Sequence, residues 1–415
     1  MTGGTQQEKK SKSPSSGTRD QPWQLRIWTG ICAGAWYRIL WRNRFAVGPT
    51  RIGMALLLCG ISGINTLLWL VQTALMGRQI DRTRIRQAPV FVLGHWRSGT
   101  TLLHELLVLD PRHTYPDTFS CFAPNHFLLS APYVKWWLGY LMPKQRPMDN
   151  MSVSWDHPQE DEWALCNMGI PSPYLMLIFP RRPRQCQEYM DLREVPAPAL
   201  ARWKRALVWF LKALTVQNPK RIVLKSPPHT CRIKTLLELF PDARFVHIVR
   251  DPYVIFPSTI RTWKRMSRFH GLQKPYEEGW EEYVFNTFNR MYDVYEEDRK
   301  LVDPAHFCEI RYEDLVADPV GQMERVYRDL DLGDYEAAHP AIQQYAERTK
   351  DYKVNRYELA PATRDEITRR WGAFAERYGY ALEPVEAQHE GGEEGTGEEG
   401  TGLICLKGPE GASHK

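Results

Sequence analysis

Residues 91–107, with the sequence FVLGHWRSGTTLLHELL, have the layout of a phosphate-binding loop. An apolar run of strand type reaches Gly94, four residues separate it from Gly99, and two threonines open an apolar pattern of helical type. The glycines allow a tight turn that brings backbone N–H groups to an anion, and the helix beginning near Thr100 adds the positive end of its dipole. The stretch therefore predicts a strand, an anion-binding loop and a helix in direct succession.

The side chains of this loop differ from those of nucleotide triphosphatases. Thr100 stands where those proteins place a lysine, and Arg97 is the only cation between the two glycines. A triphosphate would be poorly neutralised here, because the lysine is missing and no apolar strand nearby ends in an aspartate suited to Mg²⁺. We expect a nucleotide that presents less crowded charge, bound by donors of these loop residues: Gly94, Arg97, Ser98, Gly99, Thr100 and Thr101.

A second anion-binding pattern lies in residues 245–259, FVHIVRDPYVIFPST. Arg250 closes an apolar strand, and Pro252 can begin a helix that carries Ser258. An arginine at the mouth of a strand can make a bidentate phosphate contact, and a serine about two turns later can reach the same group. Alone, the arginine with Asp251 and Pro252 is explained better by a salt-bridged strand end. Together with the loop, it predicts a nucleotide with phosphates at two positions.

Strand-like and helical runs alternate from residue 88 to about residue 383. Four short apolar runs read as strands: 89–94, 221–225, 244–249 and 306–312. Because a helical segment follows each run, the fold class is α/β, with a P-loop-type parallel sheet flanked by helices. Ligands of such sheets bind at the carboxyl ends of the strands, where the anion-binding residues stand.

The chain of 415 residues divides into four segments. Residues 1–20 and 386–415 are expected to be disordered tails, the second of them an acidic Gly/Glu tail. Residues 21–86 form an amphipathic or hydrophobic helical segment, and residues 87–385 form the enzyme domain. The net charge of +5 is mild, and no basic run with interleaved aromatics indicates nucleic-acid binding. The scattered cysteines lack metal-site spacing and read as free thiols of a reducing compartment.

Residues 21–86 have the composition of a membrane interface. No acidic residue lies between Asp20 and Asp81, and tryptophans and arginines crowd the first half of that stretch. The uncharged run from Ile52 to Gly77 is long enough to span a bilayer. Its polar residues would nevertheless form one stripe along a helix: Ser62, Asn65, Thr66, Trp69, Gln72 and Thr73. Three interpretations are open: a monotopic or re-entrant membrane contact, a single span, and a helical layer covering the enzyme core.

An acidic cluster, SWDHPQEDEWAL at residues 154–165, precedes an apolar helical run. Clustered carboxylates raise the pKa of at least one member, which suits a general base for an acceptor hydroxyl. The alternative is that these acids complement the dipole of the first helical turn. Lys225, in LKSPPHT, can face the reacting group or the solvent, and His229 is a weaker candidate base.

Together these motifs resemble the sulfotransferases that use 3′-phosphoadenosine-5′-phosphosulfate (PAPS). The resemblance rests on GHWRSGTT (94–101) for the 5′-phosphosulfate loop, VRDPYVIFPS (249–258) for the 3′-phosphate site, and IRYEDLVADP (310–319). It covers about residues 88–383 and is closest to a bacterial branch distantly similar to the tyrosylprotein and carbohydrate enzymes. Cytosolic members have lysine where Arg97 stands, so a guanidinium would take the role of that lysine.

The resemblance implies PAPS as donor, adenosine bisphosphate as product, and no metal. A sulfonyl group carries less negative charge than a γ-phosphoryl group, so one arginine with amides and hydroxyls can stabilise its transfer. The usual base in such relatives is a glutamate in a similar acidic motif, which favours Glu160 over Glu162 and His157. A late loop closes over the nucleotide in the family, which implies donor contacts for three residues that an ordinary surface turn would also explain: Lys353, Asn355 and Tyr357.

The acceptor is expected to be a small molecule, lipid or carbohydrate with a hydroxyl or amine group. Residues 114–143, with one apolar helix around 133–141, are predicted to form the acceptor-binding lid, although core packing explains the same composition. An apolar lid and an interfacial N-terminal segment fit an amphiphilic acceptor at a cytoplasmic membrane surface, with a Golgi-type lumenal enzyme as the alternative. The rival functions are a P-loop kinase that requires ATP and Mg²⁺, and a catalytically silent, membrane-anchored PAPS-binding protein.

Overall fold

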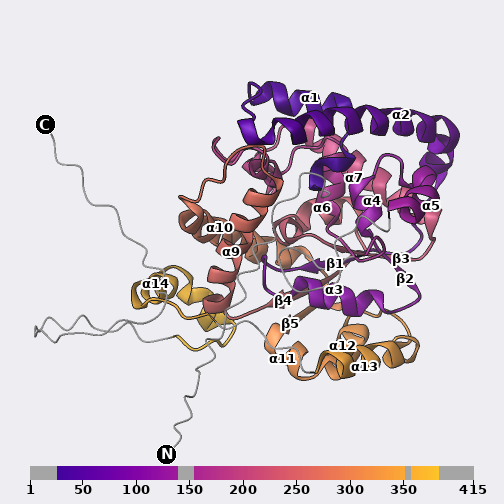
Figure 1. The fold of residues 1–415 in the computed structure, drawn as a ribbon. Helices are drawn as coiled ribbons and strands as arrows, with labels where there is room; N and C mark the ends of the chain where they lie inside the picture. The colour runs from indigo at the N-terminus through magenta and orange to yellow at the C-terminus, as the bar shows by residue number, and fades with distance from the viewer. Residues whose placement is uncertain (1–25, 139–153, 351–356, 383–415) are drawn as a thin grey trace, which may run out of the picture.

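The computed structural model of the chain describes residues 26–138, 154–350 and 357–382. Within these residues, parallel strands form one sheet in the order β2-β3-β1-β4-β5 (Figure 1). The bounds of the strands are β1 Val90–Leu93, β2 His113–Thr114, β3 Arg221–Lys225, β4 Arg244–Val249 and β5 Phe307–Arg311. In the centre, Val90 of β1 stands opposite Val223 on one side and Arg244 on the other. The loop that follows β1 therefore leaves the middle of the carboxyl edge.

The four predicted strands are present, which confirms the α/β class. Strands β3 and β4 have the predicted bounds, and β1 and β5 are one residue shorter at each end. The edge strand β2 was not predicted, because its two residues carry no apolar run. Only pairing with β3, with His113 opposite Arg221, identifies it as a strand.

Helices cover both faces of the sheet because successive strand residues point to opposite sides. Val90 and Val92 of β1 belong to one hydrophobic cluster, and Phe91 and Leu93 belong to another. The first cluster includes residues of α3 Thr100–Val108, α11 Tyr312–Ala317, α12 Pro319–Asp329 and α13 His339–Thr349. The second includes residues of α6 Asp161–Asn167, α7 Ala197–Gln217, α8 Ile233–Leu239, α9 Pro252–His270, α10 Trp280–Asp298 and α14 Pro361–Arg377. Figure 1 shows these two layers on either side of the strands.

The N-terminal segment adds a helical layer to the second cluster. Its main elements are α1 Ala33–Arg42 and the long apolar helix α2 Ile52–Arg82, which lie side by side at the edge of the molecule (Figure 1). The stretch predicted as a lid contains α4 Thr118–Phe122 and α5 Phe127–Leu138, so its helix begins earlier than predicted. Phe119 and Phe127 are buried in the core. The predicted tails, residues 1–20 and 386–415, lie outside the described residues.

Candidate active site

The loop after β1 is shaped by both of its glycines. Gly94 and Gly99 have positive φ angles of 146° and 103°. A Cβ atom on Gly99 would lie 2.3 Å from Cδ2 of Tyr312, and one on Gly94 would lie 2.7 Å from the carbonyl oxygen of Ile248. Both positions therefore exclude a side chain on steric grounds as well as by conformation. Arg97 also has a positive φ of 70°, a conformation that costs a residue with a side chain about 1 kcal/mol or more.

Not every polar group of the loop faces outward. Ser98 is buried, and its Oγ donates to the carbonyl oxygen of His95 at 2.8 Å. The backbone N–H of Gly94 donates to Oγ1 of Thr230, also at 2.8 Å. These bonds brace the turn, so Ser98 and Gly94 shape the loop. Its anion-facing part begins at Arg97.

The two predicted phosphate sites meet at one place. Nε of Arg97 donates to Oγ of Ser258 at 2.9 Å, and Nη1 of Arg250 donates to the carbonyl oxygen of Arg97 at 3.1 Å. The guanidinium carbon of Arg250 lies 3.9 Å from the ring centre of Tyr312. Burial lowers the pKa of Arg250, the phenol of Tyr312 opposes this shift, and the positive charge of Arg97 adds to it. Two adjacent guanidinium groups in a half-enclosed place are suited to bind an anion.

A cavity of about 1000 Å³ opens beside these groups. The predicted donor-binding residues that line it are Arg97, Gly99, Thr100, Thr101, Arg250, Ser258 and Tyr357. Lys353 and Asn355, which were predicted to bind the donor, lie outside the described residues. Of the predicted lid, residues 114–143, the structure describes 114–138, and in this part Tyr115 lines the cavity. The opposite wall was not predicted, and it includes Val316, Pro319 and Val320 together with part of α13.

Glu160 and Lys225 form a partly buried pair next to the loop. Nζ of Lys225 donates to Oε1 of Glu160 at 2.9 Å, and the side chains are 4% and 15% exposed respectively. The hydroxyl of Tyr174 donates to the other oxygen of Glu160 at 2.6 Å and accepts from Nε1 of Trp96, a loop residue, at 2.8 Å. Burial and the nearby carboxylate of Glu160 raise the pKa of Tyr174 well above its ordinary value, so this phenol stays a donor. Lys225 is therefore held inside the protein and does not project into solvent.

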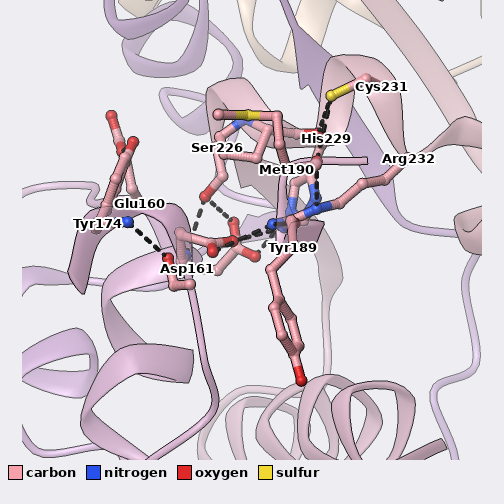
Figure 2. Close-up of polar contacts among 12 residues, drawn as sticks. Glu160, Asp161, Tyr174, Tyr189, Met190, Ser226, His229, Cys231 and Arg232 are labelled. Carbon is pink, nitrogen blue, oxygen red and sulfur yellow. Dashed lines mark hydrogen bonds and ion pairs between the residues drawn. The ribbon is translucent and has the colours of Figure 1, made fainter. Parts of the chain in front are cut away.

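The neighbouring acids, Asp161 and Glu162, are fully buried. Figure 2 shows Asp161 beside Ser226 and His229. Glu162 is fully buried and accepts from Nη1 and Nη2 of Arg232 at 2.6 and 3.2 Å. Oδ2 of Asp161 lies 2.7 Å from Nε2 of His229, and Oδ1 accepts from Oγ of Ser226 at 2.8 Å. Burial alone would raise the pKa of Asp161, but these two partners lower it below its ordinary value. The placement argues against Glu162 and His229 as the base, because both are fully buried and each is paired with a buried partner, Arg232 and Asp161 respectively.

A second pair of titratable side chains, His157 and Glu105, lies on the cavity wall. Nε2 of His157 lies 3.0 Å from Oε1 of Glu105, whose other oxygen accepts from the hydroxyl of Tyr345 at 2.8 Å. All three residues line the cavity. His157 was a predicted candidate, but Glu105 and Tyr345 were not. The only signal for Glu105 was a single charge inside the apolar run TLLHELLV, which is residues 101–108.

Comparison with known proteins identifies relatives over most of the chain. A model of the sulfotransferase family matches residues 89–336. Proteins of Mycobacterium bovis and Mycobacterium tuberculosis, named omega-hydroxy-beta-dihydromenaquinone-9 sulfotransferase Stf3, are 47% identical over 372 residues, which is 89% of this chain and 95% of each relative.

Two solved structures are similar in fold. Sulfotransferase STF9 from Mycobacterium avium has a TM-score of 0.62 at 18% identity, covering 85% of this chain and 98% of the other. Sulfotransferase STF1 from Mycobacterium tuberculosis has a TM-score of 0.55 at 20% identity, covering 83% and 94%. At these identities the likeness supports the fold alone.

Proposed function

Since the chain belongs to the sulfotransferase family and is a sulfotransferase, we propose that it transfers a sulfonyl group from PAPS to the terminal hydroxyl of a menaquinone-type isoprenoid quinone. The donor part of this proposal is carried by one observation, the contact of Arg97 with Ser258 and Arg250 at the cavity. The acceptor part is supported by the activity for which the relatives that align over 95% of their length are named.

The donor would be held by its two phosphate positions. Backbone amides of the loop, with Thr100 and Thr101 at the start of α3, suit the 5′-phosphate. Arg250 and Ser258 suit the 3′-phosphate, because a guanidinium and a hydroxyl from neighbouring elements converge there. Arg97 stands between the two groups and can stabilise the charge that develops on the leaving phosphate. Tyr357 lines the same cavity, and we propose that Lys353 and Asn355 complete the donor site with it.

The transfer would proceed as an in-line displacement at sulfur. The acceptor oxygen forms a bond to sulfur while the bond between sulfur and the phosphate oxygen breaks, and the adenosine bisphosphate leaves with that electron pair. The proton of the acceptor hydroxyl passes to a base, for which we propose Glu160. Lys225, 2.9 Å from Glu160, supplies positive charge beside the reacting groups. None of these steps requires a divalent metal.

Glu160 is preferred to His157 because it is tied to the donor loop. Its hydrogen bond to Tyr174 continues to Trp96 inside the loop, whereas His157 is paired with Glu105 on the side of α3. The observation that favours His157 instead is that it lines the cavity, whereas Glu160 does not. Substitution of each residue decides between them. Glu160→Gln should lower kcat by about 10²- to 10⁴-fold, while His157→Asn should retain most of the rate. The reverse result would move the base to His157.

We also propose that the enzyme works at the cytoplasmic surface of a membrane. A polyisoprenoid acceptor resides in a bilayer, and the relatives that share its activity are bacterial, which gives no support to the Golgi-type alternative.

The test is a transfer assay with the purified full-length chain. Radiolabelled PAPS is incubated with an omega-hydroxylated menaquinone in detergent, and the products are separated by liquid chromatography and mass spectrometry. We expect label in a sulfated quinone and none with the same quinone lacking the hydroxyl group. Transfer to a different acceptor would overturn the acceptor class but keep the enzyme class. Phosphoryl transfer from ATP with Mg²⁺ would favour the kinase, and PAPS binding without transfer to any acceptor would favour the silent binding protein.

A further inference from the structure

Helix α2 exposes apolar side chains, whereas its polar residues Ser62, Asn65 and Gln72 are buried. Most of its exposed large apolar residues lie on one side of the helix, which we call the outer face: Ile52, Leu56, Leu57, Ile64, Leu67, Leu70, Val71 and Leu75. Trp69 and Thr73 of the predicted polar stripe are exposed outside this face. Of the most apolar 18-residue stretch of this helix, 28% is buried. A surface helix in water shows the reverse arrangement, with polar residues outside. The outer face of α2 is therefore suited to contact something other than water.

The polar stripe of α2 is bonded to the enzyme. Nδ2 of Asn65 donates to the carbonyl oxygens of Thr29 and Ile31 at 2.7 and 3.1 Å. Nε2 of Gln72 donates to the carbonyl oxygen of Asn125, and its Oε1 accepts from the backbone N–H of Leu129, both at 3.0 Å. These bonds fix the middle of α2 along the body of the protein. A single transmembrane span would have to break them, or to take the elements packed on α2 into the bilayer.

Helix α1 borders the outer face with aromatic and basic side chains. It is joined to α2 by a bond from Nε1 of Trp36 to Sγ of Cys59 at 3.3 Å and by one from the N–H of Ala33 to Oγ1 of Thr66 at 2.9 Å. Figure 1 shows the two helices adjacent. The exposed residues of α1 and of the turn after it form a rim: Tyr37, Arg38, Trp41, Arg42, Arg44 and Phe45.

The charge of this region selects the partner. No acidic residue lies between Asp20 and Asp81, so no carboxylate of that stretch offsets the exposed arginines. Trp41 is 75% exposed, which is unfavourable for an indole in water but typical of the headgroup zone of a membrane. Positive charge beside an apolar face complements anionic phospholipids. A second copy of the chain would bring the same arginines toward each other and is less well matched.

We propose that the outer face of α2 and the rim of α1 dock the enzyme on an anionic lipid bilayer, with α2 lying parallel to the membrane plane. The apolar side chains enter the boundary between headgroups and acyl chains, and the arginines contact lipid phosphates. The globular domain stays in water, because the hydrogen bonds of Asn65 and Gln72 are kept. This inference does not depend on the identity of the acceptor, so it can hold or fail separately from the proposed function.

Vesicle flotation of the full-length chain tests the apolar part. We expect the wild-type protein to float with vesicles of phosphatidylcholine and phosphatidylglycerol. The triple variant Leu57→Glu, Leu67→Glu, Leu75→Glu should lose at least tenfold in bound fraction. Its matched control is Leu301→Glu, which changes an equally exposed leucine, 56% exposed, at the end of the short helix Arg299–Leu301 far along the chain from α2. Both variants should bind adenosine bisphosphate as wild type does, which shows that they are folded.

The basic part is tested with the charge of the vesicles. Each arginine near an anionic surface contributes about 1 kcal/mol, so Arg38→Gln, Arg42→Gln and Arg44→Gln together should weaken binding to anionic vesicles by about a hundredfold at low salt. Binding to vesicles of pure phosphatidylcholine should hardly change. Undiminished binding of the triple arginine variant to anionic vesicles would contradict the role of the rim. A different result would assign the outer face to a second copy of the chain. In that case the wild type would not float but would sediment as a dimer, and the leucine variant would sediment as a monomer.

The orientation of α2 is tested by measuring how deep three of its positions lie in the bilayer. A fluorophore is attached to each of three single variants: Leu57→Cys, Ile64→Cys and Leu75→Cys. Quenching by lipids that carry a nitroxide at defined positions then measures how deep each site lies. The unsubstituted chain, labelled in the same way, gives the background. A helix parallel to the membrane predicts the same depth at all three sites. A steady change of depth from the first site to the last would show a span and overturn the proposal.

Discussion

Substituting Glu162 with glutamine is expected to separate stability from catalysis within the acidic cluster. The substitution keeps the shape of the side chain but removes the charge that faces Arg232. Both side chains are fully buried, and the two oxygens of Glu162 accept from the guanidinium at 2.6 and 3.2 Å. After the change, one oxygen remains to accept from Arg232, beside the carbonyl oxygens of Tyr189 and Met190, but the negative charge that faces the guanidinium is gone.

The magnitude follows from that burial. Breaking a buried ion pair by removing one partner costs about 3–5 kcal/mol, because the remaining charge is left uncompensated. A domain has a total stability of about 5–15 kcal/mol, so Glu162→Gln should lower the thermal midpoint by on the order of 10 °C. Glu160→Gln should lower kcat about 10²- to 10⁴-fold instead, which is about 3–5 kcal/mol in the barrier. Its effect on the midpoint should be smaller, because Glu160 is 15% exposed and water can reach this pair, whereas Arg232 and Glu162 are both 0% exposed.

The assay combines thermal unfolding, followed by near-ultraviolet circular dichroism, with single-turnover transfer normalised to adenosine bisphosphate binding sites. We expect Glu162→Gln to be less stable and nearly as active per site, and Glu160→Gln to show the opposite. An unchanged midpoint with lost turnover in Glu162→Gln would refute the structural role of Glu162. Full turnover in Glu160→Gln would remove Glu160 as the base.

Three further predictions concern the loop, the metal and the pH. Gly99→Ala should weaken adenosine bisphosphate binding at least tenfold in calorimetry, because its Cβ would lie 2.3 Å from the ring of Tyr312; wild-type affinity would contradict the steric account. Chelation of divalent metals should leave the transfer rate unchanged, and a several-fold loss would revive a metal-dependent reaction. Burial lowers the pKa values of His95, His104 and His270 to about 3. Because the folded state holds them neutral while the unfolded state binds protons near pH 6.5, stability should be full above that pH and fall below it, by up to about 1.4 kcal/mol per pH unit for each histidine. A thermal midpoint that does not change between pH 7 and pH 5 would contradict this.

The proximity of the two predicted phosphate-binding motifs was predictable because it depends on a topological rule. Arg97 follows β1 and Arg250 follows β4, and these strands are neighbours in the sheet. Since parallel strands end at one edge, two motifs more than 150 residues apart in sequence meet there, at the 3.1 Å bond between these arginines. The strands themselves were visible as short β-branched runs, except β2, whose two residues carry no pattern.

The acidic cluster could not be resolved from sequence. Glu160, Asp161 and Glu162 are consecutive at the start of α6, and a helix turns its side chains by about 100° per residue. Consecutive acids therefore face different surroundings, and only the packed structure shows which one meets Lys225 and which one meets Arg232.

The same limit applies to α2. Its polar stripe was visible in sequence, but the side that it faces depends on hydrogen bonds to distant residues such as Asn125. The wall formed by Val316 and Val320 was hidden for the same reason, because it joins α3 only through the tertiary fold.

The most direct test of the central claim is a calorimetric titration of the purified chain with adenosine 3′,5′-bisphosphate and, separately, with adenosine 5′-monophosphate. A hydrogen-bonded contact with a charged group contributes about 1.5–3 kcal/mol, so the 3′-phosphate at Arg250 and Ser258 should strengthen binding about tenfold to a hundredfold. The account predicts this difference in the wild-type protein and its loss in Arg250→Met. Equal affinity for both nucleotides, or no binding of the bisphosphate, would contradict it.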